Sequence, residues 1–363
     1  MSKAPLEPAG APLVTVIIVA HNAGAFLRPC LAALAAQTYQ DFEAVLVDNA
    51  STDGAVDPDC LPDDRFRIFA PGENLGFAAA NNQVAREVSS RWIALLNPDT
   101  RATAEWLENL LKGAERWPGA AAFGSTQTRL SEPEILDGAG DVWHAAGIAW
   151  RALEGHSVSE NPPEGETFAA CAAAALYDRQ TFVDLGGFDE TFFCYCEDID
   201  FGFRLRLARG FSVQIRDAVV LHAGSGTTGR DSEFTLFHGH RNRVWVFIKN
   251  TPGLLMWLLL PLHVALNLRI LQKAPSDAYR QTLKRAYAAA WDGRKEILAA
   301  RRKVQVRRGV SMMQLARMMA WTPKKITKRS ALLDKSGQRI NRHTAAAVGN
   351  DPVKMQEGAN GEK

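Results

Sequence analysis

Apolar runs that end in short polar segments predict buried strands in the first part of the chain. Residues 13–20 read LVTVIIVA, a continuous run rich in β-branched side chains. Such runs are typical of strands that are buried on both faces of a parallel sheet. Residues 42–54 (FEAVLVDNASTDG) and 91–100 (RWIALLNPDT) show the same pattern, each ending in a polar turn. We therefore expect three buried strands here, and a further one over 211–221.

Helical segments separate these predicted strands. Residues 24–37, approximately, place Leu27, Leu31 and Leu34 on one face, which predicts an amphipathic helix. Residues 66–87 read as a short strand, a loop and a second helix. Strands that alternate with helices at this spacing predict an α/β domain with a mixed, mostly parallel sheet.

Polar residues gather where three of the predicted strands end. They are His21, Asn22, Asp48, Asn49, Asn97 and Asp99. In open α/β sheets, ligands bind beyond the carboxyl ends of the strands. Three polar strand ends in register therefore favour a binding site over three unrelated turns.

An acidic cluster follows a segment that looks buried, in FFCYCEDIDFGFRLRLARG at 192–210. Glu197, Asp198 and Asp200 lie within four positions. Like charges so close to apolar residues repel one another and are costly to desolvate. Either a cation or substrate interacts with them, or they belong to a solvated turn.

Five motifs together resemble the family 2 glycosyltransferases, in the branch of the rhamnosyltransferases. They are TVIIVAHN, VLVDNASTDG, NLGFAAANN, LLNPDT and LGGFDETFFCYCEDIDFGFRLRLARG, and they follow in the family's order over roughly residues 13–245. The resemblance implies a GT-A fold and transfer of a sugar from a nucleoside-diphosphate donor with inversion at the anomeric carbon. It also implies a divalent cation, Mg²⁺ or Mn²⁺, and an acceptor that is a saccharide or is linked to a lipid.

The resemblance places the donor site at the strand ends. The donor-binding residues that it implies are Ala20, Asn22, Asp48, Asn49, Gly76, Asn82, Asn97 and Asp99. Asp48 is expected to contact the nucleoside, although an aspartate here also suits an ordinary turn. Gly76 would let the backbone approach the donor. The glycine pair common in the family is replaced by Ala79 and Ala80.

The resemblance also implies a metal site and a catalytic base. Asp99 is the metal-binding carboxylate, with Asn97 in place of the family's first aspartate, and His222 is a second candidate metal ligand. Asp198 is the expected general base and Glu197 the residue that orients the site or binds acceptor. Asp200 is expected to begin a helix.

Two neighbours of the acidic pair have simpler interpretations. Asp200 and Arg204 fit an ion pair at a helix start, and Arg204 with Arg206 would neutralise the cluster.

Residues 224–229 read GSGTTG, a literal GxGxxG. No βαβ unit follows it, so we expect a glycine loop that closes over the donor, with a nicotinamide-dependent enzyme as the weaker alternative.

The charge distribution separates the C-terminal part from the rest. Residues 1–268 contain 20 Lys/Arg and 33 Asp/Glu, whereas residues 269–342 contain 20 Lys/Arg and 4 Asp/Glu. An apolar run at 254–268 precedes the basic part and, with fifteen residues, is short for a membrane span. We expect 246–342 to be a helical extension that lies on an anionic membrane surface, with a packed helical hairpin as the alternative. A nucleic-acid partner is not expected.

The remaining features concern the compartment, the two termini and the donor. The five cysteines show no metal-ligand spacing and the N-terminus has no apolar signal core, so we expect free thiols and a cytoplasmic location at the inner membrane face. Residues 1–12 and 343–363 are expected to be disordered. A non-catalytic sugar-nucleotide or lipid-binding scaffold remains an alternative function. The donor is not fixed, since dTDP-rhamnose and UDP-hexoses both fit.

Overall fold

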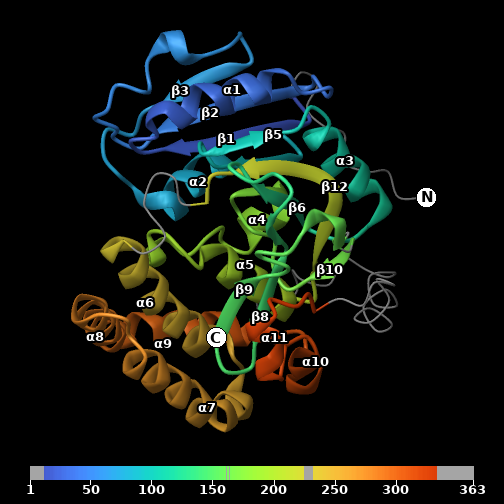
Figure 1. Ribbon diagram of the computed structural model, residues 1–363. Coiled ribbons are helices and arrows are strands. Elements are labelled where there is room, and N and C mark those ends of the chain that lie inside the picture. Colours follow the sequence, from blue (N-terminus) through green and yellow to red (C-terminus); the bar gives the residue numbers. More distant parts are fainter. Residues whose placement is uncertain (1–11, 161, 163, 225–231, 333–363) are drawn as a thin grey trace, which may run out of the picture.

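A mixed ten-stranded sheet lies at the centre of the molecule (Figure 1). The computed structural model describes residues 12–160, 162, 164–224 and 232–332. The strands are β1 (Val14–Ala20), β2 (Phe42–Asp48), β3 (Phe66–Phe69), β4 (Trp92–Leu96), β5 (Thr100–Ala102), β6 (Ala122–Arg129), β7 (Leu136–Ala139), β8 (Asp141–His144), β9 (Ile148–Arg151), β10 (Gly165–Thr167), β11 (Ala174–Asp178) and β12 (Ser212–His222).

The helices cover the sheet and form the C-terminal part of the described chain. The α-helices are α1 (Leu27–Ala35), α2 (Gly76–Glu87), α3 (Trp106–Arg116), α4 (Arg179–Asp184), α5 (Glu197–Leu207), α6 (Glu233–Asn250), α7 (Gly253–Gln272), α8 (Asp277–Asp292), α9 (Arg294–Val306), α10 (Met312–Arg317) and α11 (Pro323–Thr327). Short 3₁₀ helices lie at Gly24–Phe26, Pro58–Cys60, Val158–Glu160 and Glu190–Phe192.

The sheet has a parallel half and a mixed half. Its strand order is β10-β12-β6-β11-β4-β1-β2-β3, with β5 paired to β12 and β7 paired to β6. The strands β4, β1, β2 and β3 are parallel to one another. Strand β11 runs antiparallel between β4 and β6, and β12 runs parallel to β6. A separate hairpin, β8-β9, stands beside the sheet.

Both faces of the sheet are buried, which explains the continuous apolar strands. All seven residues of β1 are buried. Alternate residues belong to two different cores: Val16 and Ile18 pack with α1 and α3, whereas Ile17 and Val19 pack with α2, α4 and α5. The predicted strand at 13–20 is therefore confirmed.

The expected extension is continuous with the rest of the fold. Helix α6 runs through residues 245 and 246, where a domain boundary was expected. Trp245 and Phe247 of α6 share a core with Trp143 of β8 and Phe203 of α5. The two parts thus have a common core, and Figure 1 shows α6 to α9 gathered at one end of the molecule.

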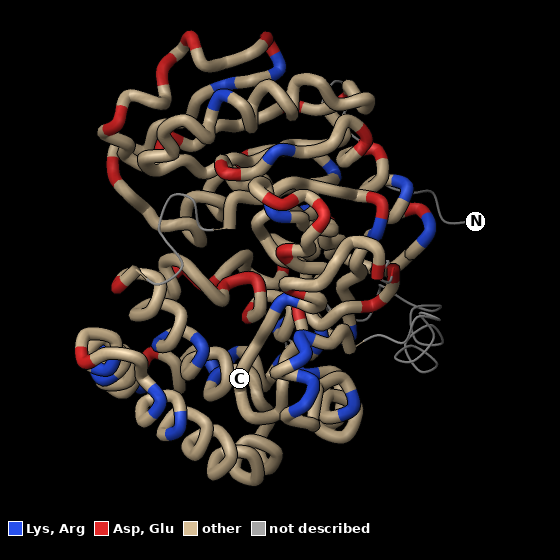
Figure 2. Tube along the Cα trace, viewed as in Figure 1, with Lys and Arg blue, Asp and Glu red and all other residues tan. Residues whose placement is uncertain are grey.

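Charge is divided between these parts as the sequence predicts. Figure 2 shows acidic residues over the sheet region and basic residues along the C-terminal helices. The expectations for residues 1–11, for 333–363 and for most of the glycine loop at 225–229 concern parts of the chain outside the described residues.

Candidate active site

The first two strands end side by side, and hydrogen bonds tie their loops together. Ala20 pairs with Asp48 in the register of β1 and β2. Asn22 has a left-handed backbone with φ of 53°, and its side-chain oxygen accepts a hydrogen bond from the Thr52 N–H at 2.8 Å. Asp48 accepts one from the Ser51 N–H at 2.9 Å, so it forms a turn as its residue type favours. The donor-binding roles of Ala20, Asn22 and Asp48 stay predictions.

Asn49 and Gly76 fix the loop that leads into α2. The buried side chain of Asn49 accepts a hydrogen bond from the Leu75 N–H and donates one to the Asn74 side chain, both at 2.8 Å. Gly76 has φ of +79°, and a Cβ there would lie 2.5 Å from the Phe193 ring. Glycine is thus required by Phe193 itself, whether or not the backbone also approaches a donor.

Asn82 does not have the environment expected of a donor ligand. Its buried amide group donates to the Phe188 carbonyl at 2.8 Å and to Glu190 at 2.9 Å, and its oxygen accepts from the Phe188 N–H at 2.8 Å. These bonds hold the segment before α5 against α2. These contacts give Asn82 a role in packing, and its predicted donor-binding role stays a prediction.

Asp99 and His222 meet at one end of the site, although 123 positions separate them. Strand β5 pairs with β12, which places His222 Nε2 3.4 Å from Asp99 Oδ1. On the other side of the ring, Nδ1 lies 2.7 Å from Asp137 Oδ2. Burial lowers the pKa of His222, but the hydrogen bonds to Asp137 and Asp99 outweigh it and raise the pKa above its ordinary value.

Two residues of this group were not predicted from the sequence. Asp137 is buried and forms an ion pair with Arg151 of β9 as well as its contact with His222. The guanidinium of Arg151 also lies 3.5 Å from His222 Nδ1. The sequence around Asp137 reads LDGAGD, residues 136–141. Its two aspartates and two glycines fit an ordinary turn as well as a functional site.

A strained loop presents the acidic pair at the start of α5. Phe193, Tyr195 and Cys196 have φ of 66°, 71° and 66°, which is a left-handed conformation that non-glycine residues rarely adopt. The amide of Asn242 in α6 donates hydrogen bonds to backbone carbonyls on this loop, including those of Cys194 and Tyr195 at 2.8 Å. Strain of this kind persists only where the surroundings hold it, and it is concentrated at functional sites.

Asp198 projects from the first turn of α5. One carboxylate oxygen accepts a hydrogen bond from the Ala172 N–H at 3.2 Å, and the other accepts one from the Ile199 N–H at 2.8 Å. Burial raises the pKa of Asp198, and these backbone bonds only partly oppose it. The pKa of the neighbouring Glu197 is raised well above its ordinary value by burial and by Asp198. A carboxylate with a raised pKa is a better proton acceptor near neutral pH.

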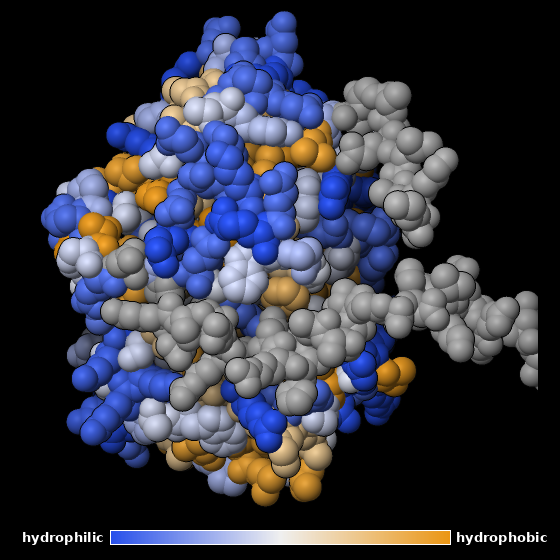
Figure 3. Space-filling model, turned by 90° about the vertical axis from the view of Figure 1, so that its right-hand side faces the viewer, coloured by the Kyte–Doolittle hydropathy of each residue, from blue (hydrophilic) through white to orange (hydrophobic). Residues whose placement is uncertain are grey.

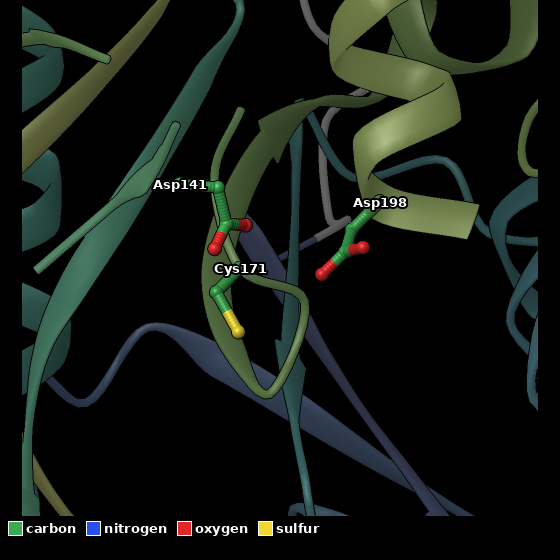
Figure 4. Close-up of side chains that lie close together, drawn as sticks. All are labelled: Asp141, Cys171 and Asp198. Carbon is green, nitrogen blue, oxygen red and sulfur yellow. The ribbon is translucent and has the colours of Figure 1, made fainter. Parts of the chain in front are cut away.

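Asp198 and Asn97 line the same cavity, of about 320 Å³. Asn97 follows β4, and its backbone N–H donates to the Ala173 carbonyl at 2.8 Å, which ties that strand end to the cavity wall. Figure 4 shows Asp141, Cys171 and Asp198 pointing toward one another from three segments. The cavity is lined by Phe77, Asn97, Asp141, Ala149, Trp150, Arg151, Cys171, Ala172, Ala173, Cys194, Tyr195, Cys196, Glu197, Asp198, Ile199, Thr235 and Gly239.

The third acid and the two arginines of α5 have structural roles. Asp200 is fully buried and pairs with Arg204 at 2.7 Å, which confirms the predicted ion pair. Arg206 instead pairs with Glu166 of β10 at 2.6 Å. Arg206 therefore does not neutralise the acidic pair, contrary to the expectation.

A larger cavity, of about 930 Å³, lies between the segment 185–191 and α9. Its lining includes Arg86, Arg204 and Arg307, and it contains neither Asp198 nor Asp99. The smaller cavity is the better candidate active site, because it joins the acidic pair to the strand ends.

The sequence of the sheet region matches a known family. Residues 15–185 match the family model described as Glycosyl transferase family 2. The matched part contains the strand ends up to Asp99 and the residues Asp137, Asp141 and Arg151. Asp198 and His222 lie beyond it.

Curated relatives extend the similarity over more of the chain. An N-acetylglucosaminyl-diphospho-decaprenol L-rhamnosyltransferase of Mycobacterium tuberculosis is 29% identical over 269 residues, which cover 65% of this chain and 84% of that protein. The O-antigen biosynthesis protein RfbC of Myxococcus xanthus is 31% identical over 225 residues, which cover 56% of this chain and 16% of RfbC.

A solved structure shares the fold. The crystal structure of GalNAc-T7 with UDP, GalNAc and Mn²⁺ superposes with a TM-score of 0.56, covering 77% of this chain and 55% of that one. The sequence identity is 14%, so the likeness concerns the fold alone.

Proposed function

We propose, from the premise that this chain is a family 2 glycosyltransferase with the GT-A fold, that it transfers a hexosyl group with inversion from a nucleoside-diphosphate donor to a hydroxyl of its acceptor. The observation that carries the proposal is the shared cavity. It joins Asp198, whose pKa is raised, to Asn97 at the strand end that leads to Asp99. In a one-step transfer, the base that deprotonates the acceptor and the site that binds the donor diphosphate must lie next to each other, because both act at the same anomeric carbon.

Asp198 acts as the general base in this proposal. The acceptor oxygen forms a bond to the anomeric carbon while its proton passes to the Asp198 carboxylate. The bond from the anomeric carbon to the diphosphate breaks, and its electron pair leaves with the nucleoside diphosphate. Attack from the face opposite the leaving group inverts the anomeric centre. Glu197 lies beside Asp198, and burial together with Asp198 raises the pKa of Glu197 well above its ordinary value, which disfavours a second negative charge there.

Asp99 and His222 fit a divalent cation at the donor diphosphate. Both are buried, their nearest ligand atoms are 3.4 Å apart, and one carboxylate plus one imidazole is a donor set that suits Mn²⁺ or Mg²⁺ together with diphosphate oxygens. When bound, the cation would neutralise charge on the departing diphosphate. Asp137 holds the imidazole by its other nitrogen, which orients Nε2 toward Asp99. Asp48 and Asn22 are the proposed contacts to the nucleoside.

The acceptor is proposed to be a lipid-linked saccharide, and the donor sugar a rhamnose. The mycobacterial relative is named for the transfer of L-rhamnose to N-acetylglucosaminyl-diphospho-decaprenol. A lipid-linked acceptor stays in its membrane, so the enzyme has to work at the membrane surface. The product then belongs to the synthesis of a cell-surface polysaccharide, on the cytoplasmic face.

Helix α7 has the surface that such a location needs. It has 20 residues and is long and apolar enough to span a bilayer, which corrects the expectation that this segment is too short. The helix is nevertheless docked along one side, through the buried residues Leu255, Leu259 and His263. His263 Nδ1 donates a hydrogen bond to the Ala146 carbonyl, 2.9 Å away, because a carbonyl oxygen can only accept.

The outward side of α7 is apolar over residues 254–268, while the polar residues of that stretch, His263 and Asn267, face the protein. Trp257 and Leu258 are 64% and 66% exposed, and Asn267 pairs with Arg243 of α6. A soluble surface helix shows the opposite arrangement. Figure 3 shows apolar side chains at the lower end of the molecule, where α7 lies in Figure 1. We therefore propose that α7 lies in the membrane interface, with the basic helices α8 and α9 attracted to anionic lipid.

Release of nucleoside diphosphate tests the proposed reaction. The purified full-length chain is incubated with Mn²⁺, a short-chain prenyl N-acetylglucosaminyl diphosphate, and in turn dTDP-L-rhamnose, UDP-glucose, UDP-N-acetylglucosamine and GDP-mannose. We expect turnover with dTDP-L-rhamnose and a product whose new linkage is inverted by NMR. A retained anomeric configuration contradicts the mechanism, and binding of all donors with no turnover favours a non-catalytic scaffold.

A further inference from the structure

Asp141 opens the β8-β9 hairpin and is held rigidly against the cavity wall. Its backbone N–H donates to the Ala169 carbonyl at 3.1 Å. Its carbonyl accepts from the Phe168 N–H at 3.1 Å and from the Thr167 hydroxyl at 2.9 Å. The same stretch carries Ala172, whose N–H binds Asp198. The backbone thus fixes the position of Asp141 relative to Asp198.

The side chain of Asp141 lacks the contacts that would explain its burial. It is 5% exposed, and its Oδ2 atom has no hydrogen-bond partner among the residues that the structure describes. A buried polar atom without a partner is costly, and the few that occur call for a specific explanation. Burial and Asp198 raise the pKa of Asp141 well above its ordinary value, and Arg151 opposes this only in part. The buried carboxyl group of Asp141 therefore lowers the stability of the fold, and a ligand that forms the missing hydrogen bond would explain its position.

The distances suit a sugar hydroxyl. Oxygen atoms of Asp141 and Asp198 and the sulfur of Cys171 lie within 4.8 Å of one another. Hydroxyl groups on adjacent sugar carbons lie close enough together for one to reach Asp141 while its neighbour reaches Asp198, each over about 2.7 Å. The same cavity offers the aromatic side chains of Trp150 and Tyr195, beside which a sugar ring packs well.

A metal ion is the other ligand that these three side chains fit by distance. Two features disfavour it. Burial raises the pKa of the Cys171 thiol to about 12, so the thiolate that a metal requires is scarce. The guanidinium of Arg151 lines the same cavity and acts electrostatically on Asp141, Cys171 and Asp198. A neutral polyol avoids both penalties.

We propose that Asp141 binds the acceptor sugar, by a hydrogen bond to the hydroxyl next to the one that Asp198 activates. The proposal rests on the proposed function above. Asp141 holds the sugar by one hydroxyl while Asp198 takes the proton from its neighbour, so the acceptor is a sugar with two adjacent hydroxyls at the transfer site. The hairpin β8-β9 is then the element that selects the acceptor.

Acceptor kinetics of Asp141→Ala and Asp141→Asn test this role. The probe is the short-chain prenyl N-acetylglucosaminyl diphosphate, with dTDP-L-rhamnose as donor and the exposed Asp64→Asn as matched control. We expect Asp141→Ala to raise the acceptor KM about tenfold, the scale of one hydrogen bond, while the donor KM stays at the wild-type value. Asp141→Asn should show a smaller increase, since its amide still forms a hydrogen bond. Melting curves of both variants establish that they are folded.

Deoxy acceptors provide the second arm. The wild type should have a higher KM for an acceptor that lacks the hydroxyl next to the attacked one than for the complete acceptor. Asp141→Ala should have the same KM for both acceptors. An unchanged acceptor KM in both variants, or the same deoxy penalty in wild type and Asp141→Ala, overturns the assignment while transfer itself stands. Inhibition of the wild type by Zn²⁺ that Asp141→Ala relieves overturns it in favour of a cation site. Absence of transfer by the wild type contradicts the proposed function, and the role of Asp141 with it.

Discussion

The carboxylate of Asp200 lies 2.9 Å from the ammonium group of Lys249, and both side chains are buried. Asp200 also accepts hydrogen bonds from Arg204 at 2.7 Å and from the Asn250 amide at 2.8 Å. Lys249 is paired with Asp189 as well. This network joins α5, the helix that carries Asp198, to the end of α6, so α5 and the C-terminal helices are held as one unit.

Replacing Lys249 by methionine should destabilise the fold. The change leaves Asp200 and Asp189 without their shared cation, and breaking a buried ion pair on one side costs about 3–5 kcal/mol. Urea unfolding measures the loss. Lys112→Met is the matched control, because Lys112 forms an exposed pair with Glu108 that is worth about 0–1 kcal/mol. Equal midpoints for the two variants would contradict a structural role for the network.

Acid should weaken the same network. Burial alone would raise the pKa of Asp200, but Lys249 and Arg204 outweigh it and lower the pKa to about 2. The pKa is depressed on folding, so the stabilisation is present above the ordinary aspartate pKa of 3.8 and is lost as the pH falls toward 2. The difference in melting temperature between wild type and Asp200→Asn should therefore shrink between pH 5 and pH 2, about the range in which this group titrates. A constant difference would exclude this carboxylate as the cause.

Asp141 should show the opposite pH dependence. Its pKa is raised on folding, so the acid form is the stable one and the stability of the wild type falls as the pH rises above the ordinary aspartate range. Asp141→Asn removes this titration, while Asp198 on α5, Cys171 on the cavity wall and Arg151 on β9 keep their places. We expect the asparagine variant to melt higher than wild type at pH 7 and to lose this advantage toward pH 4 (about the unfolded-state pKa). A variant that is less stable at pH 7 would indicate a structural role for the carboxylate.

Asp198→Asn should fold and bind donor but lose transfer. The amide keeps the size of the side chain and cannot accept the acceptor proton, and loss of a general base costs about 10²–10⁴-fold in rate. Initial rates with dTDP-L-rhamnose, together with calorimetric binding of dTDP, separate chemistry from binding. The exposed Asp64→Asn serves as control. Near-normal turnover by Asp198→Asn would reject the assignment of the base.

Asp99→Ala should weaken the binding of nucleoside diphosphate only in the presence of the metal. If Asp99 holds the cation against the diphosphate, its removal lowers dTDP affinity with Mn²⁺ by at least about tenfold. Without Mn²⁺ the two proteins should bind alike. Isothermal calorimetry with and without Mn²⁺ makes the comparison, with the exposed Asp217→Ala as control. Affinities that do not respond to Mn²⁺ in either protein would remove the metal role.

The apolar face of α7 should control membrane binding. We expect full-length protein to sediment with phosphatidylglycerol vesicles, less so as salt screens the basic helices. Replacing Trp257 and Leu258 together by serine should weaken binding by at least about tenfold, since each buried apolar side chain contributes about 1.5–3 kcal/mol. Val158→Ser, which alters an exposed valine in a distant 3₁₀ helix, is the control. Unchanged sedimentation of the double variant would favour an α7 that merely packs on the protein.

The sequence by itself determined the elements and the chemistry at their ends. Continuous burial on both faces requires an apolar residue at nearly every position of a central strand, so β1 is visible as a run. The sequence predicted a mixed, mostly parallel sheet and gave no strand order. Asp48, Asn97 and Asp99 lie at or just beyond the ends of such runs, and Asp198 stands in an acidic pair whose burial is costly. These signals are local, which is why a single sequence contains them.

Tertiary structure decided which distant residues meet. Asp137 and Asp141 lie in a glycine-rich stretch with no periodicity. The pairing of β6 with β7 brings Asp137 to His222, and the bridge between Asp141 and Ala169 brings Asp141 to Asp198. The motif predicts that Asn82 contacts the donor, and only the structure shows that its amide group forms hydrogen bonds with the Phe188 backbone. Hydropathy likewise shows that α7 is apolar but not that His263 faces inward. Contacts across the sheet depend on strand order and register, and these are set by the whole chain and not by any one segment.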